Sequence, residues 1–177
     1  MPGGGVIMRN QWVRFIAIAA LVTFHALPLA ARENSTKLYA EAQRRALSGD
    51  IEGAITGFRA VVAISPYYAL GHYGLGKALL HTENGTDLAI RHLRRAVLLD
   101  RRLAKGYFYL GMALMFQKNY RHALHAFNNA YRNNAEMIES LYNMYAIYDI
   151  MEARGKAQRY FDLYRTKKAK EERDVLF

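Results

Sequence analysis

The sequence contains no cysteine, so neither a disulfide, a lipid-modified N-terminal cysteine nor thiol chemistry is available to it. Proline occurs only three times in 177 residues, and no low-complexity tract is present. Because alanine, leucine and tyrosine are plentiful, this composition favours helices over a sandwich of short strands. Apolar residues make up 52% of the chain and charged residues 23%, which predicts one folded domain with a buried core.

The chain also lacks the short motifs that mark common catalytic sites. It has no GxSxG, HExxH, Walker or dinucleotide-binding pattern, so we expect no enzymatic activity and no cofactor. His122 and His125 are three residues apart, a spacing that can place two metal ligands on one helix face. No third ligand stands at a diagnostic spacing, and we therefore expect a solvated helix face and no metal site.

The N-terminal residues differ from the rest of the chain. Two arginines flank a polar start, and an apolar run then extends from Phe15 to Ala31. A basic start, an apolar middle and small residues at the exit are typical of a secretory signal peptide. A retained anchor is the alternative, but the run has about 17 residues, fewer than a spanning helix needs, and contains His25 and Pro28. We expect residues 1–31 to be a cleaved signal peptide.

Such a leader predicts export, and the bacterial periplasm is the compartment that we expect for a chain without cysteine or lipid anchor. A eukaryotic secretory origin stays open, in which Asn34 and Asn84 would be glycosylation acceptors. The chain carries 25 basic and 15 acidic residues, a formal net charge of +10, which favours acidic partners and anionic surfaces. We expect no nucleic-acid partner, because nucleic-acid binding would require the protein not to be exported.

Alanines recur along the chain at a nearly constant interval. Ala54, Ala89, Ala123 and Ala157 are separated by 35, 34 and 34 residues, and a large apolar residue follows each of them four positions later. Leu-Gly pairs at 75–76 and 110–111 repeat at an interval of 35 residues. A period of this length indicates stacked copies of one supersecondary unit.

This repeat resembles a known family. Two copies carry the pattern most clearly, namely His72-x-x-Leu75-Gly76-x-x-Leu79 with Ala89-x-x-x-Leu93, and Tyr107-x-x-Leu110-Gly111-x-x-Leu114 with Ala123-x-x-x-Phe127. The pattern resembles the tetratricopeptide repeat and covers about residues 35–167. The chain departs from it where Arg101 and Ala135 replace prolines, and where Tyr145 replaces a small residue in the fourth copy. The resemblance implies an all-α, right-handed superhelical solenoid of about four helix-turn-helix repeats, followed by a basic tail at 168–177.

The pattern also predicts the helices and the turns between them. We expect helices near residues 36–48, 51–64, 69–82, 87–100, 104–117, 120–132, 138–151 and 154–167. Small residues such as Gly111 remove bulk where the two helices of a pair cross, so the helix axes can approach closely. Gly49 and Gly85 are expected to adopt a positive φ after first helices, and Asp50 or Thr86 to cap the helices that follow.

The resemblance further implies a binding groove. In the family, the first helix of each pair lines a concave face, and certain positions on it commonly contact a peptide or a partner helix. At the fifth position this chain has an aromatic ladder of Tyr39, Tyr73, Phe108 and Tyr142. Around the ladder we expect Lys77, His81, Lys105, Met112, Met115 and Phe116, the last three as an exposed apolar patch. Packing of the rings against a neighbouring repeat is the alternative interpretation.

These expectations describe a non-enzymatic adaptor that holds a peptide or helix in its groove and assembles an envelope complex. A clamp for a C-terminal carboxylate, found in some family members, is not expected, because Gly74 and Tyr109 replace its polar side chains. The alternative is a structural protein that binds anionic membrane or wall surfaces through basic runs at 91–105 and 165–173. Because the repeats are few, self-association through an end or through the groove is a further hypothesis.

Overall fold

The structure, a computed structural model, describes residues 33–175, so the predicted signal peptide lies outside the described residues. Across this range the chain forms helices joined by short turns, with no strand. The described part of the first helix spans residues 33–47. It is followed by α2 (Ile51–Ile64), α3 (Ala69–Leu79), α4 (Thr86–Leu99), α5 (Ala104–Phe116), α6 (Tyr120–Asn133), α7 (Glu139–Ile150) and α8 (Arg154–Val175).

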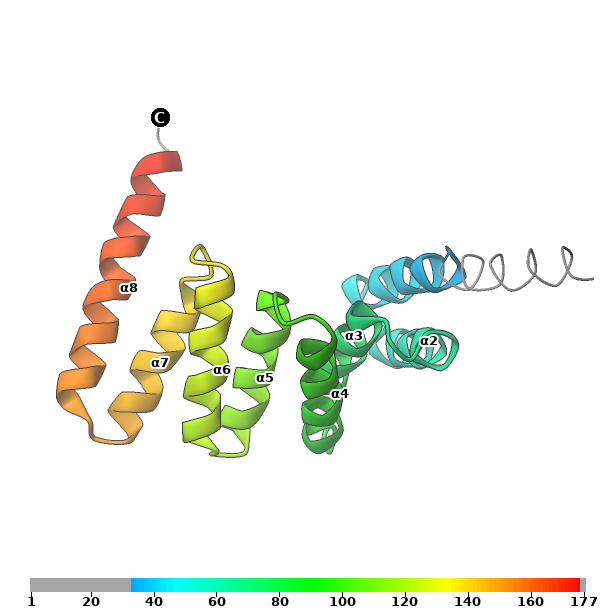
Figure 1. Ribbon diagram of the computed structural model, residues 1–177, viewed down its shortest axis with the longest axis horizontal. Helices are drawn as coiled ribbons and strands as arrows, with labels where there is room; N and C mark the ends of the chain where they lie inside the picture. Colours follow the sequence, from blue (N-terminus) through cyan, green and yellow to red (C-terminus); the bar gives the residue numbers. More distant parts are fainter. Residues whose placement is uncertain (1–32, 176–177) are drawn as a thin grey trace, which may run out of the picture.

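The helices stand side by side in chain order, from the first helix at one end to α8 at the other (Figure 1). Among α2 to α8, the extensive contacts all join one helix to the next helix in sequence. The helices therefore form successive pairs, and the predicted all-α solenoid of about four repeats is confirmed.

Small residues allow the two helices of a pair to touch, as the periodicity predicted. A side-chain Cβ at Gly111 would lie 2.8 Å from the Phe127 ring, and one at Gly76 would lie 2.7 Å from Leu93. The repeated alanines at positions 54, 89, 123 and 157 are all buried in the same interfaces. Each glycine thus makes room for a large side chain of its partner helix.

In the fourth pair, two aromatic rings pack against each other where the helices cross. Tyr145 lies 34 residues after Gly111, and its ring centroid is 5.0 Å from that of Phe161. Phe161 in turn lies 34 residues after Phe127. The predicted register of α7 is therefore correct, and a tilted pair of rings occupies the crossing where the third pair has a glycine against a ring.

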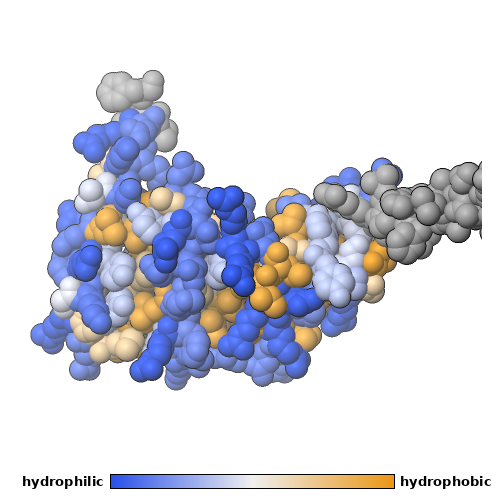
Figure 2. All heavy atoms as spheres, in the orientation of Figure 1, coloured by the Kyte–Doolittle hydropathy of each residue, from blue (hydrophilic) through white to orange (hydrophobic). Residues whose placement is uncertain are grey.

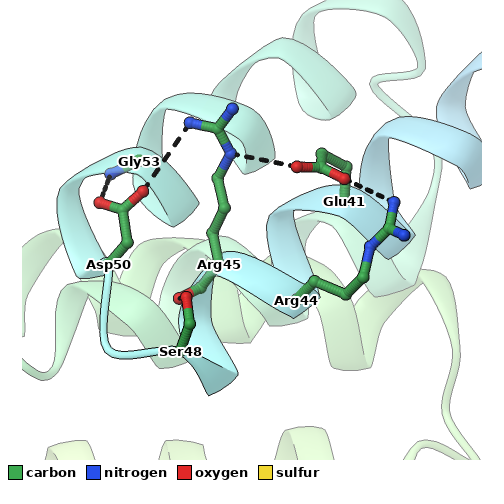
Figure 3. A network of polar contacts seen from close by, with 6 residues as sticks. All are labelled: Glu41, Arg44, Arg45, Ser48, Asp50 and Gly53. Atoms are coloured by element: carbon green, nitrogen blue, oxygen red, sulfur yellow. Dashed lines mark hydrogen bonds and ion pairs between the residues drawn. The ribbon is translucent and has the colours of Figure 1, made fainter.

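The turn before α2 forms as predicted. Gly49 has a φ of +87°, in the left-handed region that favours glycine. Asp50 caps α2, since its Oδ1 accepts a hydrogen bond of 2.9 Å from the backbone N–H of Gly53. The carboxylate of Asp50 also lies 3.8 Å from the guanidinium of Arg45, which pairs in turn with Glu41 (Figure 3).

The other turns differ from the prediction. Gly85 has a φ of −78° and is itself the N-cap residue of α4, where Thr86 is the first helical residue and not the cap. This turn comprises six residues, 80–85, whereas the other turns within a pair, at 48–50, 117–119 and 151–153, have three each, so the chain reverses without a left-handed glycine. In the two later turns Lys118 and Glu152 hold the left-handed conformation, each with a φ of 57°.

The last helix is longer than predicted. We expected it to end at residue 167, but α8 has 22 residues and continues to Val175. The segment after 167 contains no glycine or proline and is rich in lysine and glutamate, which are good helix formers. Despite this length α8 is polar, and no helix in residues 33–175 is long and apolar enough to cross a membrane.

Candidate functional site

Two hollows adjoin on the face that the first helices of the pairs form. The first has a volume of about 180 Å³ and is lined by Tyr39, Gln43, Ala46, Leu47, Ile51, Phe58, Tyr73, Gly74, Lys77, Ala78 and His81. The second has a volume of about 280 Å³ and is lined by Tyr73, Lys77, Lys105, Phe108, Tyr109, Met137 and Glu139. Because Tyr73 and Lys77 line both, the hollows form one groove that extends from the first helix to the start of α7.

The first hollow is predominantly apolar. Phe58 forms part of its wall, and Leu47 lies at its edge with 80% of its surface exposed. Gly74 allows the Phe58 ring to pack against α3, because a Cβ at this position would lie 2.4 Å from that ring. An exposed leucine beside an apolar hollow favours contact with an apolar side chain of another molecule.

The second hollow carries most of the charge of the groove. Lys77 and Lys105 are cationic, and Glu139 is the only acidic residue that lines either hollow. The Nζ atom of Lys77 lies 5.1 Å from the centre of the Tyr109 ring, which holds the ammonium over an aromatic face. The net positive charge of this part of the groove favours an acidic group in a bound segment.

Two rings of the aromatic ladder pack against rings of second helices, and a third packs against a ring of the neighbouring repeat. The Tyr39 ring lies 5.4 Å from that of Phe58, and the Phe108 ring lies 5.7 Å from that of Phe127. Tyr73 is only 9% exposed, and its ring lies 5.9 Å from that of Tyr109. Burial, with smaller contributions from the hydroxyls of Tyr109 and Tyr39, raises the pKa of Tyr73 well above its ordinary value. These rings therefore act as fixed walls of the groove, with the Tyr73 hydroxyl protonated.

Four of the predicted site residues line neither hollow. Tyr142 is half exposed and packs its ring against Tyr145 and Tyr164, at centroid distances of 5.7 and 5.3 Å. The predicted exposed patch is wrong for Met112 and Met115, which are half-buried and pack against the core. The remaining member, Phe116, is 58% exposed at the end of α5. The structure therefore concentrates the candidate site in the first three repeats.

Several residues of the groove were missing from the predicted set, notably Leu47, Ile51, Tyr109 and Met137. The repeat period could have identified Leu47, which lies 34 residues before the predicted His81. Ile51 and Met137 lie outside the positions that the resemblance marks, and Tyr109 stands at a position that the resemblance marks only for the carboxylate clamp. The packing of neighbouring helices brings these three side chains to the groove.

The two histidines of α6 are exposed and form local hydrogen bonds. The Nδ1 atom of His122 lies 2.8 Å from the side-chain oxygen of Asn119, and the Asn129 side-chain nitrogen lies 3.2 Å from His125 Nδ1. Within residues 33–175, no three or more histidine, aspartate or glutamate side chains gather as a metal site would require.

Solved structures with similar folds give the comparison with known proteins. The crystal structure of MamA matches with a TM-score of 0.75 and 20% identity, over 93% of this chain and 95% of that chain. The first TPR of Spaghetti (RPAP3), bound to the HSP90 peptide SRMEEVD, matches with a TM-score of 0.65 and 16% identity, over 68% and 94%. The Arabidopsis OM64 TPR domain matches with a TM-score of 0.63 and 15% identity, over 66% and 96%. No protein-family model and no curated protein matches the chain. At these identities the comparisons establish the fold alone, an all-α solenoid like that of the two TPR structures.

Proposed function

We propose that this protein is a non-enzymatic scaffold that holds a segment of a partner protein in the groove. The observation that carries the proposal is the continuity of the two hollows through Tyr73 and Lys77. An extended segment or a helix that lies along this line contacts three repeats at once. Contacts with several rigid rings can anchor a partner at a small cost in conformational entropy.

The lining of the groove indicates the chemistry of the bound segment. The apolar hollow beside Leu47 suits a large apolar side chain, and the lysines of the second hollow suit a carboxylate further along the segment. The similar fold of RPAP3 holds an acidic peptide, which supports this assignment by analogy. The binding mode proposed here differs from a terminal carboxylate clamp, because Gly74 and Tyr109 provide no such polar side chains.

The cellular setting is a further part of the proposal. The apolar run at 15–31 supports export, and we propose that the scaffold assembles an envelope complex in the bacterial periplasm. N-terminal sequencing of the protein from envelope fractions tests this part separately. Recovery of the intact chain from the cytoplasm would contradict it.

A photo-crosslinking amino acid in the full-length chain tests the groove. We expect Leu47, which is highly exposed at the first hollow, to give a specific adduct with a partner protein when it is replaced by the photo-crosslinker. A photo-crosslinker at Leu163, an exposed leucine of α8 that lines neither hollow, is the matched control and should not give this adduct. Charge reversal by Lys77→Glu with Lys105→Glu should abolish the adduct without changing the fold, because acidic groups of the partner lose their attraction.

Two results would overturn the groove assignment. One is the same adduct from the Leu163 position as from the Leu47 position. The other is an adduct from Leu47 that persists at full yield in the doubly reversed variant, with unchanged circular dichroism.

A further inference from the structure

The outward face of α4 carries arginines that the groove does not use. Arg91, Arg94, Arg95 and Leu98 follow one another at helical i, i+3, i+4 and i+7 spacing, so they lie on one side of α4. The opposite side of α4 is buried in the core through Ala89, Ile90, Leu93, Ala96 and Val97. No residue of α4 lines either hollow of the groove.

Two more arginines extend this face into the turn after α4. Arg101 and Arg102 are both exposed, and hydrogen bonds hold their turn in place. The side-chain nitrogen of Asn133 donates to the carbonyl oxygen of Arg101 over 3.0 Å, and the backbone N–H of Arg102 donates to Asp100 Oδ1 over 2.9 Å. The face therefore comprises five arginines, of which four are exposed and Arg95 is half-buried beside the Tyr67 ring.

No carboxylate of the described chain neutralises these arginines. The ion pairs in residues 33–175 all involve Glu41 or Asp50, near the first turn (Figure 3). Asp87 begins the same side of α4, but its carboxylate accepts a hydrogen bond from the side chain of Gln117 instead of pairing with Arg91. The positive charge of this face is therefore available to an external anion.

Exposed apolar side chains lie beside these arginines. Leu98 is 59% exposed, and Tyr67 is 77% exposed with the Arg95 guanidinium 5.5 Å from its ring centre. Figure 2 shows hydrophobic and strongly hydrophilic residues next to each other over the region of α4. We name the set Tyr67, Arg91, Arg94, Arg95, Leu98, Arg101 and Arg102 the arginine face.

We infer that the arginine face binds the surface of an anionic phospholipid membrane. Guanidinium groups pair with phosphate oxygens in a planar, bidentate geometry. Several guanidinium groups on one face are attracted together to a membrane surface that carries many negative charges. Leu98 and Tyr67 can enter the headgroup region, as apolar and aromatic residues do in peripheral membrane proteins. A nucleic acid offers negative charge without an apolar layer, and an acidic protein offers these two side chains only local apolar contacts. The inference is independent of the groove, which remains free to hold its partner.

Vesicle flotation of the full-length chain tests the inference. The readout is the fraction of protein bound to vesicles that contain phosphatidylglycerol, divided by the fraction bound to vesicles of phosphatidylcholine alone. This ratio is needed because the apolar run at 15–31 can bind both kinds of vesicle. The triple variant Arg91→Gln, Arg94→Gln, Arg95→Gln should lower this ratio by about 100-fold. The matched control Lys167→Gln, Lys168→Gln, Lys170→Gln removes the same charge from α8 and should lower it by less than about tenfold. Leu98→Ser should lower binding to the anionic vesicles by about tenfold.

Three results would overturn the inference. The first is an equal loss in the two triple variants, both folded by circular dichroism. The second is a wild-type ratio near one, or a ratio that persists at high ionic strength, since binding by exposed arginines must weaken with salt. The third is tighter binding to polyglutamate or to duplex DNA than to the anionic vesicles, which would assign the face to an acidic protein or a nucleic acid.

Discussion

The imidazole rings of His72 and His92 stack with centroids 5.3 Å apart, and their Nδ1 atoms are separated by 3.0 Å. His72 Nε2 lies 3.0 Å from the carbonyl oxygen of Pro66, which can only accept, so the Nε2 atom carries the hydrogen. In neutral His72 the Nδ1 atom is then the acceptor, and the hydrogen between the rings belongs to His92. The two histidines therefore link α3, α4 and the turn before α3 through two hydrogen bonds, one between the rings and one to Pro66.

This pair predicts that acid lowers the stability of the protein. Burial lowers the pKa of both rings, with a contribution from Arg95 at His72, and from His72, Arg91 and Arg59 at His92. Histidines of the unfolded chain take up a proton near pH 6.5, before the folded pair does. The unfolded state then binds more protons, so the free energy of unfolding decreases as the pH falls below about 6.5.

Thermal melts across this pH range check the prediction. His92→Gln retains a side-chain N–H donor but does not titrate, so its melting temperature should depend less on pH than that of the wild type. His122→Gln, at an exposed position of α6, should keep the wild-type dependence. An identical pH dependence in His92→Gln and the wild type would contradict a role of the pair.

Gly111 predicts a large loss of stability on substitution. A leucine here would overlap the Phe127 ring, and overpacking of this kind costs about 1 to 3 kcal/mol or more. Gly155→Ala is the control, because no atom lies within 4 Å of a Cβ there and alanine favours the helix by up to about 1 kcal/mol. Chemical denaturation measures both. A Gly111→Leu variant with wild-type stability would exclude the close helix crossing.

At Lys118 and at Glu152 we expect the opposite effect, in which substitution by glycine increases the stability of the protein. Both hold a left-handed φ of 57°, which glycine adopts without the Cβ penalty of about 1 kcal/mol. Lys118→Gly and Glu152→Gly should therefore each raise the melting temperature. Met151→Gly, beside Glu152, provides a matched control, since its φ of −82° gives glycine no such advantage, and this variant should lose stability.

Ser140 predicts a gain of stability when its hydroxyl is removed. Its Oγ atom is buried and has no hydrogen-bond partner within the described part of the chain. An unpaired buried hydroxyl costs about 1 to 3 kcal/mol, so Ser140→Ala should stabilise the protein by roughly 1 kcal/mol. Ser35→Ala serves for comparison, because the Ser35 hydroxyl bonds that of Ser65 at 2.7 Å and its loss should destabilise. Denaturant midpoints distinguish the two outcomes.

The repeat was predictable because each helix crossing requires particular residue sizes at fixed positions of the sequence. A crossing such as Gly111 against Phe127 needs a small residue and a large one at fixed positions, so it recurs with the period of the fold. The turns were predictable only in part. Lys118 and Glu152 adopt a conformation that their residue types do not favour, because the flanking helices fix the backbone between them.

The candidate site was less predictable than the fold. The sequence places Tyr73 and Met112 on first helices, but the depth of each side chain depends on the rings and helices behind it. The contact between His72 and His92 joins residues 20 positions apart and follows no period of the repeat. No pattern on one helix could have predicted it.

The succession of contacts from each helix to the next has a mechanical consequence. Along α2 to α8, the structure shows no extensive contact that ties distant helices together. Small rotations at several interfaces can therefore add up to a change in curvature, as in a coil spring, without breaking any single interface. Binding of a segment in the groove would then be coupled to the curvature of the solenoid. Tension on the two ends of the chain would change this curvature and with it the affinity of the groove for the segment.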